Sequence, residues 1–149
     1  MKKILLFIAF ALFGVTAQAQ LNVTSTLEKG EITEVCTIRS MYSRLMSHNK
    51  SYYIAGRTDN RFDDPFIFTL GPDAESSIQT LKDMLSIIEN RTEIVNVQQG
   101  NKKYTISLLK MVGRYYLGIK EEGLAGDFNI TIKELEKCIK KIKEKEGIE

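Results

Sequence analysis

The chain has 149 residues, of which 43% are apolar and 27% charged, with a formal charge of +2 and only two Pro, two Cys, one His and no Trp. This balance excludes a disordered or low-complexity chain, because enough apolar surface is present to offset the entropy lost on folding. Two cysteines also exclude a disulfide-dense mini-protein.

The amino-terminal end has the features of a secretory signal peptide. Lys2 and Lys3 precede an apolar run over residues 4–13, and the small residues of a cleavage site end at Ala19. The apolar run is shorter than the roughly 20 residues that span a bilayer. We expect cleavage after Ala19 and export to the periplasm or outside the cell, as in many bacterial proteins. We expect no lipid anchor, because the first mature residue, Gln20, is not a cysteine.

Removing residues 1–19 changes the charge balance. The full chain carries 21 Lys and Arg against 19 Asp and Glu, and two of the basic residues, Lys2 and Lys3, lie in the cleaved part. The mature chain, 20–149, is therefore formally neutral. It lacks the basic whole-domain charge that is the first electrostatic sign of a nucleic-acid-binding protein.

Residues 31–90 are predicted to form strands followed by a helix. β-Branched and aromatic residues favour three strand regions, at 31–45, 52–58 and 66–70. A polar loop over 59–65 separates the last two of these regions. Asp73 is a good N-cap, and apolar residues at helical spacing predict a helix that ends near residue 90.

Residues 93–146 are predicted to repeat this order. Four strands are expected, at 93–98, 104–112, 114–120 and 128–132. Thr131 and Glu134 have the spacing of a capping box, in which each side chain bonds the backbone N–H of the other residue. The final helix should begin there and end near Gly147.

A gapless shift of 62 residues aligns the two halves. It matches Tyr53 with Tyr115, Gly56 with Gly118, Phe66 with Phe128 and Thr69 with Thr131. We interpret residues 20–149 as one globular domain made of two pseudo-repeats, about 31–90 and 93–146; the alternative is a coincidence between two strand–turn–strand units. Neither half is long enough to bury a comfortable core alone, so the halves should share one.

The predicted fold class is α+β, with a continuous or paired antiparallel sheet and both helices on one of its faces. This order of strands, helix, strands and helix resembles the duplicated sheet–helix architecture of the whirly-type single-strand nucleic-acid-binding proteins. The resemblance lies in the order of elements, with no sequence motif matched. It implies a fold and carries no function with it.

Motifs that carry chemistry are scarce. His48 is the single histidine, and the sequence has no HExxH, CxxC or phosphate-binding glycine loop. The acidic loop Asp59–Asp64 offers oxygen ligands to a hard cation. It lacks the spacing of an EF-hand, however, and a polar turn is the simpler interpretation. We expect no catalytic residue set, no cofactor and no metal.

Cys36 and Cys138 are the only cysteines. Export would permit a disulfide, which would tie the first strand region to the last helix. The alternative is two separate buried thiols, since free cysteine often acts as a small core residue. We favour the disulfide.

Tyrosine and positive charge gather on the predicted strands of the second half. With Tyr104 facing the core, strand alternation turns a candidate ligand-binding set outward: Lys103, Arg114, Tyr116 and Lys120. Tyrosine beside Lys or Arg suits anionic sugars or nucleic acids, through stacking and charge neutralisation. In the first half the same alternation turns Met41, Tyr52 and Ile54 outward, which favours a protein contact and adds Tyr52 to the candidate set.

Three functions follow from these observations. The first is an exported, non-catalytic interaction module, which uses an exposed sheet face or edge to bind another extracytoplasmic protein or a second copy of itself. The second is a binder of an extracytoplasmic polyanion, either a glycan or a nucleic acid. The third is an enzyme whose catalytic residues are scattered along the chain and leave no local motif.

Overall fold

The structure is a computed structural model that describes residues 31–39, 42–92 and 94–149. The predicted signal peptide, Met41 and Glu93 lie outside these ranges. The described elements run in the order of four strands, a helix, four strands and a second helix. This order confirms the predicted α+β class and its repeated arrangement in two halves.

The first half consists of an antiparallel sheet and a helix. Sheet A contains, in spatial order, β1 (Thr33–Arg39), β2 (Ser43–His48), β3 (Ser51–Gly56) and β4 (Phe66–Gly71). Helix α2 (Ala74–Glu89) follows, and its N-cap is Asp73, as predicted. The Asp73 carboxylate accepts a hydrogen bond of 2.8 Å from the backbone N–H of Ser76, which satisfies one of the free donors at the helix start.

The second half repeats this order. Sheet B contains β5 (Ile94–Gln99), β6 (Lys102–Met111), β7 (Arg114–Glu121) and β8 (Phe128–Thr131), and helix α3 (Ile132–Glu146) follows. The predicted capping box is present, since the N–H of Thr131 donates to Glu134 (2.8 Å) and the N–H of Glu134 donates to Thr131 (3.3 Å). The helix ends at Gly147, which has the left-handed φ of 67° that glycine tolerates best.

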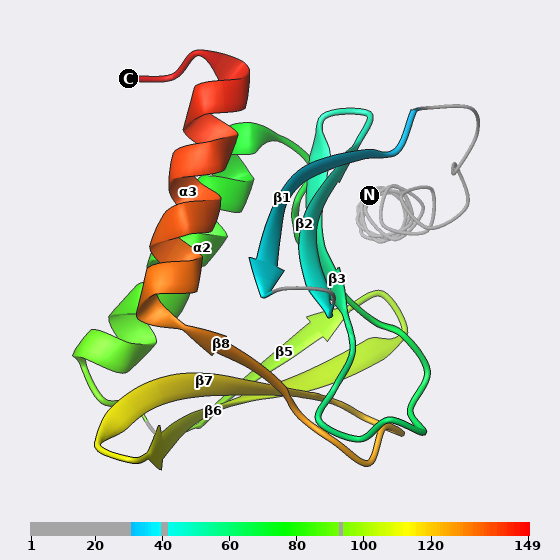
Figure 1. Ribbon diagram of the computed structural model, residues 1–149, viewed down its shortest axis with the longest axis vertical. Helices are drawn as coiled ribbons and strands as arrows, with labels where there is room; N and C mark the ends of the chain where they lie inside the picture. Colours follow the sequence, from blue (N-terminus) through cyan, green and yellow to red (C-terminus); the bar gives the residue numbers. More distant parts are fainter. Residues whose placement is uncertain (1–30, 40–41, 93) are drawn as a thin grey trace, which may run out of the picture. The chain divides into compact units, whose positions relative to one another are not determined.

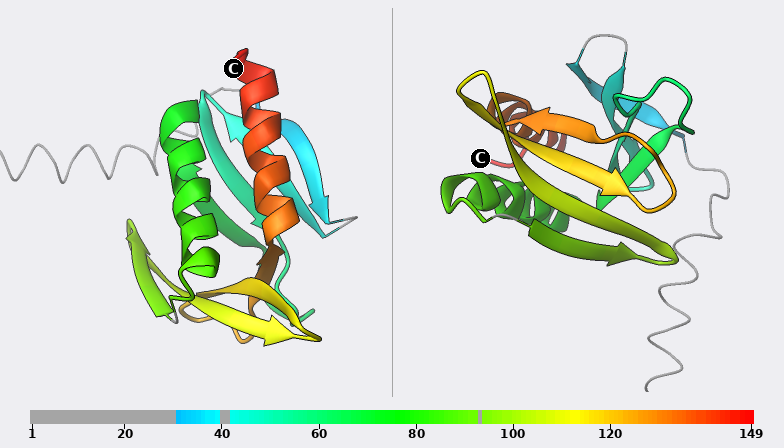
Figure 2. Two further views of the ribbon diagram at one scale, coloured as in Figure 1. Left: turned by 90° about the vertical axis from the view of Figure 1, so that its left-hand side faces the viewer. Right: turned by 90° about the horizontal axis from the view of Figure 1, so that it is seen from below.

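Both helices lie side by side on the same face of sheet A (Figure 1, Figure 2). Helix α2 packs on β3 and β4, while α3 packs on β1. Sheet B lies across one end of this helix pair and touches it through β7 and β8. The sheets are thus paired rather than continuous, and one face of sheet B is turned away from the helices.

The core contains side chains from both halves. The ring of Phe66 on β4 stacks on that of Phe128 on β8, with centroids 4.7 Å apart. Tyr104 on β6 meets Phe68 edge-on at 5.0 Å, and its hydroxyl donates to the Ile67 carbonyl (2.7 Å). Aromatic pairs of this kind contribute about 0.5–1.5 kcal/mol each beyond their buried area. This aromatic group packs between the two sheets and helps to join them.

The repeat is real in architecture, but the gapless 62-residue alignment is wrong in its first part. The paired core residues Leu45 and Ile54 of sheet A correspond to Leu108 and Leu117 of sheet B, which is a shift of 63 residues. In β4 and β8 a shift of 62 is correct, because Phe66 then matches the buried Phe128. The connection between β3 and β4 is therefore one residue longer than its counterpart.

Because of this extra residue, the gapless alignment matches each side chain of β3 with a side chain on the opposite face of β7. Tyr53 lies between the fully buried Tyr52 and Ile54, so it faces away from the core, whereas Tyr115 packs against the core. The predicted equivalence of Tyr53 and Tyr115 is therefore wrong. The cause is geometric, since a shift of one residue turns each side chain of a strand to the opposite face of its sheet.

Candidate interaction site

The predicted orientation of the strands in sheet B is correct. Tyr104 and Ile106 on β6 are buried, as are Leu117 and Ile119 on β7. The alternate positions therefore form the outer face of sheet B, and this face carries the predicted set, Lys103, Arg114, Tyr116 and Lys120. This orientation was predictable from the sequence because apolar and polar residues alternate in the first part of β6.

The set does not form one site, however. Lys120 pairs in register with Thr105 at one end of the β6–β7 hairpin, whereas Arg114 pairs with Met111 at the other end. Six residues of strand separate Lys120 from Arg114, which is about 20 Å. The outer face of sheet B therefore has two distinct ends.

The basic end is hollowed. An open hollow of about 570 Å³ lies over β5, β6 and β7, and its lining includes Asn96, Gln98, Lys103, Thr105, Lys120 and Glu122. The Lys103 ammonium lies 3.5 Å from the Glu122 carboxylate, but both side chains are well exposed and such a pair contributes little. Within the described ranges, Lys120 forms no ion pair, although its charge is near enough to Asp63 to help lower the pKa of that carboxyl.

The opposite end of this face carries exposed apolar side chains beside Arg114. Ile94 and Met111 are 62% and 47% exposed, and Val112, in the turn between β6 and β7, is fully exposed. Leu109 lies flat across Gly118, where a Cβ atom would come within 2.6 Å of the leucine side chain. Glycine at position 118 thus lets an apolar side chain spread over the outer face of sheet B.

Tyr52 does not belong to any outer surface. Its side chain is fully buried beneath α3, its hydroxyl donates to Glu146, and the Lys145 ammonium lies 5.7 Å from its ring centroid. Burial, together with the neighbouring Glu146 carboxylate, raises the pKa of the Tyr52 hydroxyl. The prediction that Tyr52 and Ile54 face outward is wrong, because β3 has the opposite phase to the one that the gapless alignment gives.

Each sheet has two edge strands, and they differ in how their free edges are protected. The edge of β4 is covered by side chains from sheet B. The Gln99 amide accepts a hydrogen bond from the N–H of Thr69 (3.0 Å) and donates to its carbonyl (2.7 Å), as a neighbouring strand would do. The Tyr104 hydroxyl bonds the carbonyl of Ile67 on the same strand. These contacts leave β4 little capacity to accept a further strand.

The edge of β1 is irregular and is covered by a helix. Its pairing with β2 shifts register between Glu34 and Cys36 and again between Thr37 and Arg39. From α3, the Lys137 ammonium donates to the Thr37 carbonyl (2.6 Å). Bulges, charges and a covering helix are the features with which natural sheets prevent unwanted strand pairing.

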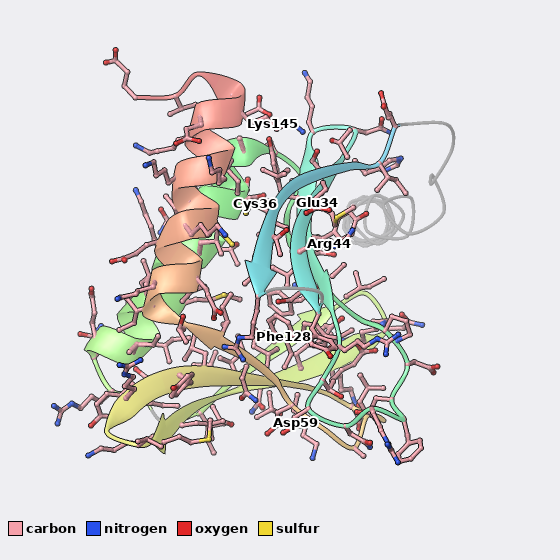
Figure 3. All side chains as sticks on the ribbon, in the orientation of Figure 1. Glu34, Cys36, Arg44, Asp59, Phe128 and Lys145 are labelled. Atoms are coloured by element: carbon pink, nitrogen blue, oxygen red, sulfur yellow. The ribbon has the colours of Figure 1, made fainter. Side chains whose placement is uncertain are left out.

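Strand β8 is only four residues long, and its start is fixed by the acidic loop. The backbone of Asp59 donates to the carbonyl of Asp127 (3.0 Å), and the N–H of Asp127 donates to the Asp59 carboxylate (2.8 Å). Figure 3 shows Asp59 on the loop that lies next to sheet B. A short edge that is held in this way also resists further pairing.

The remaining carboxylate contacts in this loop are structural. Asp63 accepts hydrogen bonds from the Thr58 hydroxyl (2.6 Å) and from the backbone of Gly126 (2.8 Å) and Ala125 (3.0 Å), and these bonds lower its pKa. Gly126 must be glycine, because a Cβ atom there would lie 2.2 Å from the Asp59 carboxylate. The simpler interpretation of the acidic loop as a polar turn fits these contacts, which join the two halves.

Strand β5 has none of these protections. Its six residues pair with β6 in uninterrupted register, and the strand contains neither a charged residue nor a proline. Ile94, Asn96 and Gln98 are exposed. Among the described residues, no hydrogen bond reaches the outer edge of its backbone, so its N–H and C=O groups on that side are free.

The sequence predicts a strand at 93–98, but none of its residues belongs to the predicted ligand-binding set. A signal was present in the sequence, because this strand has no charge over six residues while its neighbour β6 contains three lysines. Whether a strand lies at an edge depends on tertiary pairing, which composition does not reveal.

Further sequence-based candidates lie apart from this edge. His48 ends β2, and Cys36 and Cys138 are free thiols between β1 and α3, so their predicted disulfide stays a prediction. Within residues 31–39, 42–92 and 94–149, no three His, Cys, Asp or Glu side chains come together as metal ligands would. No helix in the same ranges is long and apolar enough to cross a membrane.

The chain matches no protein-family model, and no curated protein or solved structure is similar enough to count as a relative. Functional inference therefore depends on the geometry described above.

Proposed function

We propose that the protein is an exported, non-catalytic interaction module that binds a second copy of itself by pairing two β5 strands antiparallel across a two-fold axis. The observation that carries this proposal is the unprotected edge of β5, which, of the four sheet edges and among the described residues, is the one without bulges, charges or covering groups. Unpaired backbone groups on such an edge bind an extended strand through main-chain hydrogen bonds.

The chemistry of β5 favours a second copy as the occupant. Directly opposite residues of an antiparallel pair share a face of the sheet, so a two-fold axis at Asn96 gives an allowed register. This register places Ile94 opposite Gln98, Val95 opposite Val97 and Asn96 opposite itself. No like charges meet, because β5 carries none. The pairing would join two copies of sheet B into one continuous sheet with the isologous symmetry of most homodimers.

Burial also favours this pairing. Val95 and Val97 pack against the core but are only partly buried, and no described strand or helix lies beyond them at the edge. A facing strand would bring a valine against each of them and remove apolar surface from water. The exposed Ile94 would gain a neighbour at the same time.

Sedimentation velocity over a concentration series tests the proposal directly. The wild-type mature chain should form a dimer, and Asn96→Lys should make it monomeric, because two ammonium groups would then face each other across the axis. Gln79→Lys adds the same charge on the exposed side of α2 and should leave the dimer intact. A wild-type chain that stays monomeric into the millimolar range, or an Asn96→Lys variant that still dimerises, would overturn the proposal.

A second candidate is supported by the hollow at the basic end of sheet B. Lys103 and Lys120 both line it, and Lys120 has no ion-pair partner among the described residues. An anionic sugar or phosphate polymer would be bound there with strong salt dependence. Retention on immobilised heparin at low salt should be lost in Lys120→Gln and kept in Arg114→Gln, which lies at the other end. Equal loss in both variants, or no retention of the wild type, would contradict this candidate.

A further inference from the structure

The two cysteines meet where edge strand β1 lies against helix α3. Cys36 pairs in register with Leu45, which is fully buried, so its side chain is on the inner face of sheet A. Cys138 lies on the buried stripe of α3 with Leu135 and Ile142. Because α3 packs on β1 and Cys36 packs against the core, the two thiols lie at the same contact between strand and helix. Figure 3 shows Cys36 on the side of β1 that faces α3.

The two thiols differ in accessibility and acidity. Cys138 is completely buried, whereas Cys36 is partly exposed. The hydrogen bond from Cys138, with the nearby charges of Lys137 and Lys141, lowers the pKa of Cys36 to about 7, although burial and Glu34 act in the opposite direction. The same hydrogen bond and burial raise the pKa of Cys138. Cys36 therefore has the properties of an attacking thiolate, and Cys138 those of a resolving thiol.

Strand β1 depends on side-chain contacts for its position. Arg39 makes a two-bond ion pair with Glu134 (3.0 and 3.1 Å), and the Lys145 ammonium reaches the Thr33 hydroxyl (3.2 Å). The Arg39 side chain is 45% exposed, so solvent weakens its ion pair with the less exposed Glu134. The register shift beside Cys36 further weakens the pairing of β1 with β2. A covalent bond at Cys36 would therefore have a large effect on how firmly this strand is held.

We propose that Cys36 and Cys138 form a redox-active pair that closes into a disulfide by exchange with a disulfide oxidant and so locks β1 onto α3. The Cys36 thiolate attacks one sulfur of the oxidant, whose S–S bond breaks and releases one thiolate. Cys138 then loses its proton to solvent and attacks the Cys36 sulfur, which releases the second thiolate. Two protein thiols are oxidised, and one disulfide is reduced to two thiols.

The inference does not require the β5 dimer, since it concerns β1, which is an edge strand of the other sheet. Oxidation would close a loop of about 100 residues, for which the chain-entropy model predicts an increase in Tm of roughly 15 °C. The test uses the full mature chain with oxidised glutathione as the probe. Mass spectrometry should find the Cys36–Cys138 bond, and the Tm should rise and then return with a reducing agent.

Two single variants test the assigned roles. In Cys138→Ser, the reaction should stop at glutathione bound to Cys36, because no resolving thiol is present. In Cys36→Ser, the buried Cys138 should stay unmodified in the native protein. Should either variant fail to fold, alkylation of the wild-type chain replaces it, and Cys36 should react first. Two thiols that survive the oxidant, or a Cys138 that reacts as fast as Cys36, would overturn the proposal.

Discussion

Strands β1 and β5 occupy the same place in the two halves, yet their free edges are opposite in character. Each is the first strand of its half and the edge of an antiparallel sheet. Helix α3 covers β1 and donates side-chain hydrogen bonds to it, and bulges interrupt its pairing. Strand β5 is regular, uncharged and uncovered. A repeated order of elements therefore does not repeat the surface that the elements present.

The cause of this difference is where the helices pack. Both α2 and α3 lie on sheet A, so the inner face of sheet B has only their ends and the aromatic group of the core to cover it. Within residues 31–39, 42–92 and 94–149, no helix remains to cover the edge or the outer face of sheet B. The second half is therefore the part of the described chain that has an unprotected sheet edge.

The largest expected difference between the two sheets is in core stability. Leu45 on β2 is fully buried, while its counterpart Leu108 on β6 is only partly buried. Leu45→Ala should lower the free energy of unfolding by about 3 kcal/mol, and Leu108→Ala by clearly less, because less apolar surface and a smaller cavity are involved. Urea denaturation of both variants measures the difference. Equal losses would show that sheet B is covered as fully as sheet A.

The next effect concerns the contact that holds the halves together. Gly126→Ala would force a Cβ atom against the Asp59 carboxylate and the backbone of Asn60. We expect a loss of about 1–3 kcal/mol from this overpacking. Ala125→Ser, at an exposed neighbouring position, should change stability by less than about 0.5 kcal/mol. If Gly126→Ala is as stable as the wild type, the two loops are not in the close contact described.

A smaller effect should appear at low pH in the same contact. The pKa of Asp63 is lowered in the folded state by hydrogen bonds from Thr58, Gly126 and Ala125. A depressed folded-state pKa contributes stability above the unfolded value of about 3.9, and that contribution is lost as the pH falls through the folded-state pKa. Asp63→Asn should therefore flatten the acid limb of a stability–pH curve. A curve parallel to that of the wild type would contradict this role.

Local features of the sequence predicted the elements well. The caps at Asp73 and Thr131 depend on residues only three apart, so composition and spacing were sufficient to place both helices. The alternation in β6 is equally local, which is why the outward position of Lys103 was predictable.

The phase of sheet A was not predictable in the same way. Its buried positions include Ser43 and Ser47, whose hydroxyls satisfy hydrogen bonds inside the structure, so polarity did not mark the outer face of β2. Because the two connecting loops differ in length by one residue, the gapless alignment assigned β3 the wrong face. Burial of Tyr52 and the open edge of β5 both depend on tertiary pairing, which no single segment encodes.

The most direct test of the central claim is the register of the β5 pairing. With the two-fold axis at residue 96, the two copies of this residue face each other at about 4.5–5.5 Å between Cα atoms, which is within disulfide range. Two copies of residue 98 would lie about 13 Å apart. Under mild oxidation, Asn96→Cys should therefore give an intermolecular disulfide at position 96, identified by mass spectrometry, while Gln98→Cys should not. Equal crosslinking of both variants, or no crosslink at position 96, would contradict the proposed dimer.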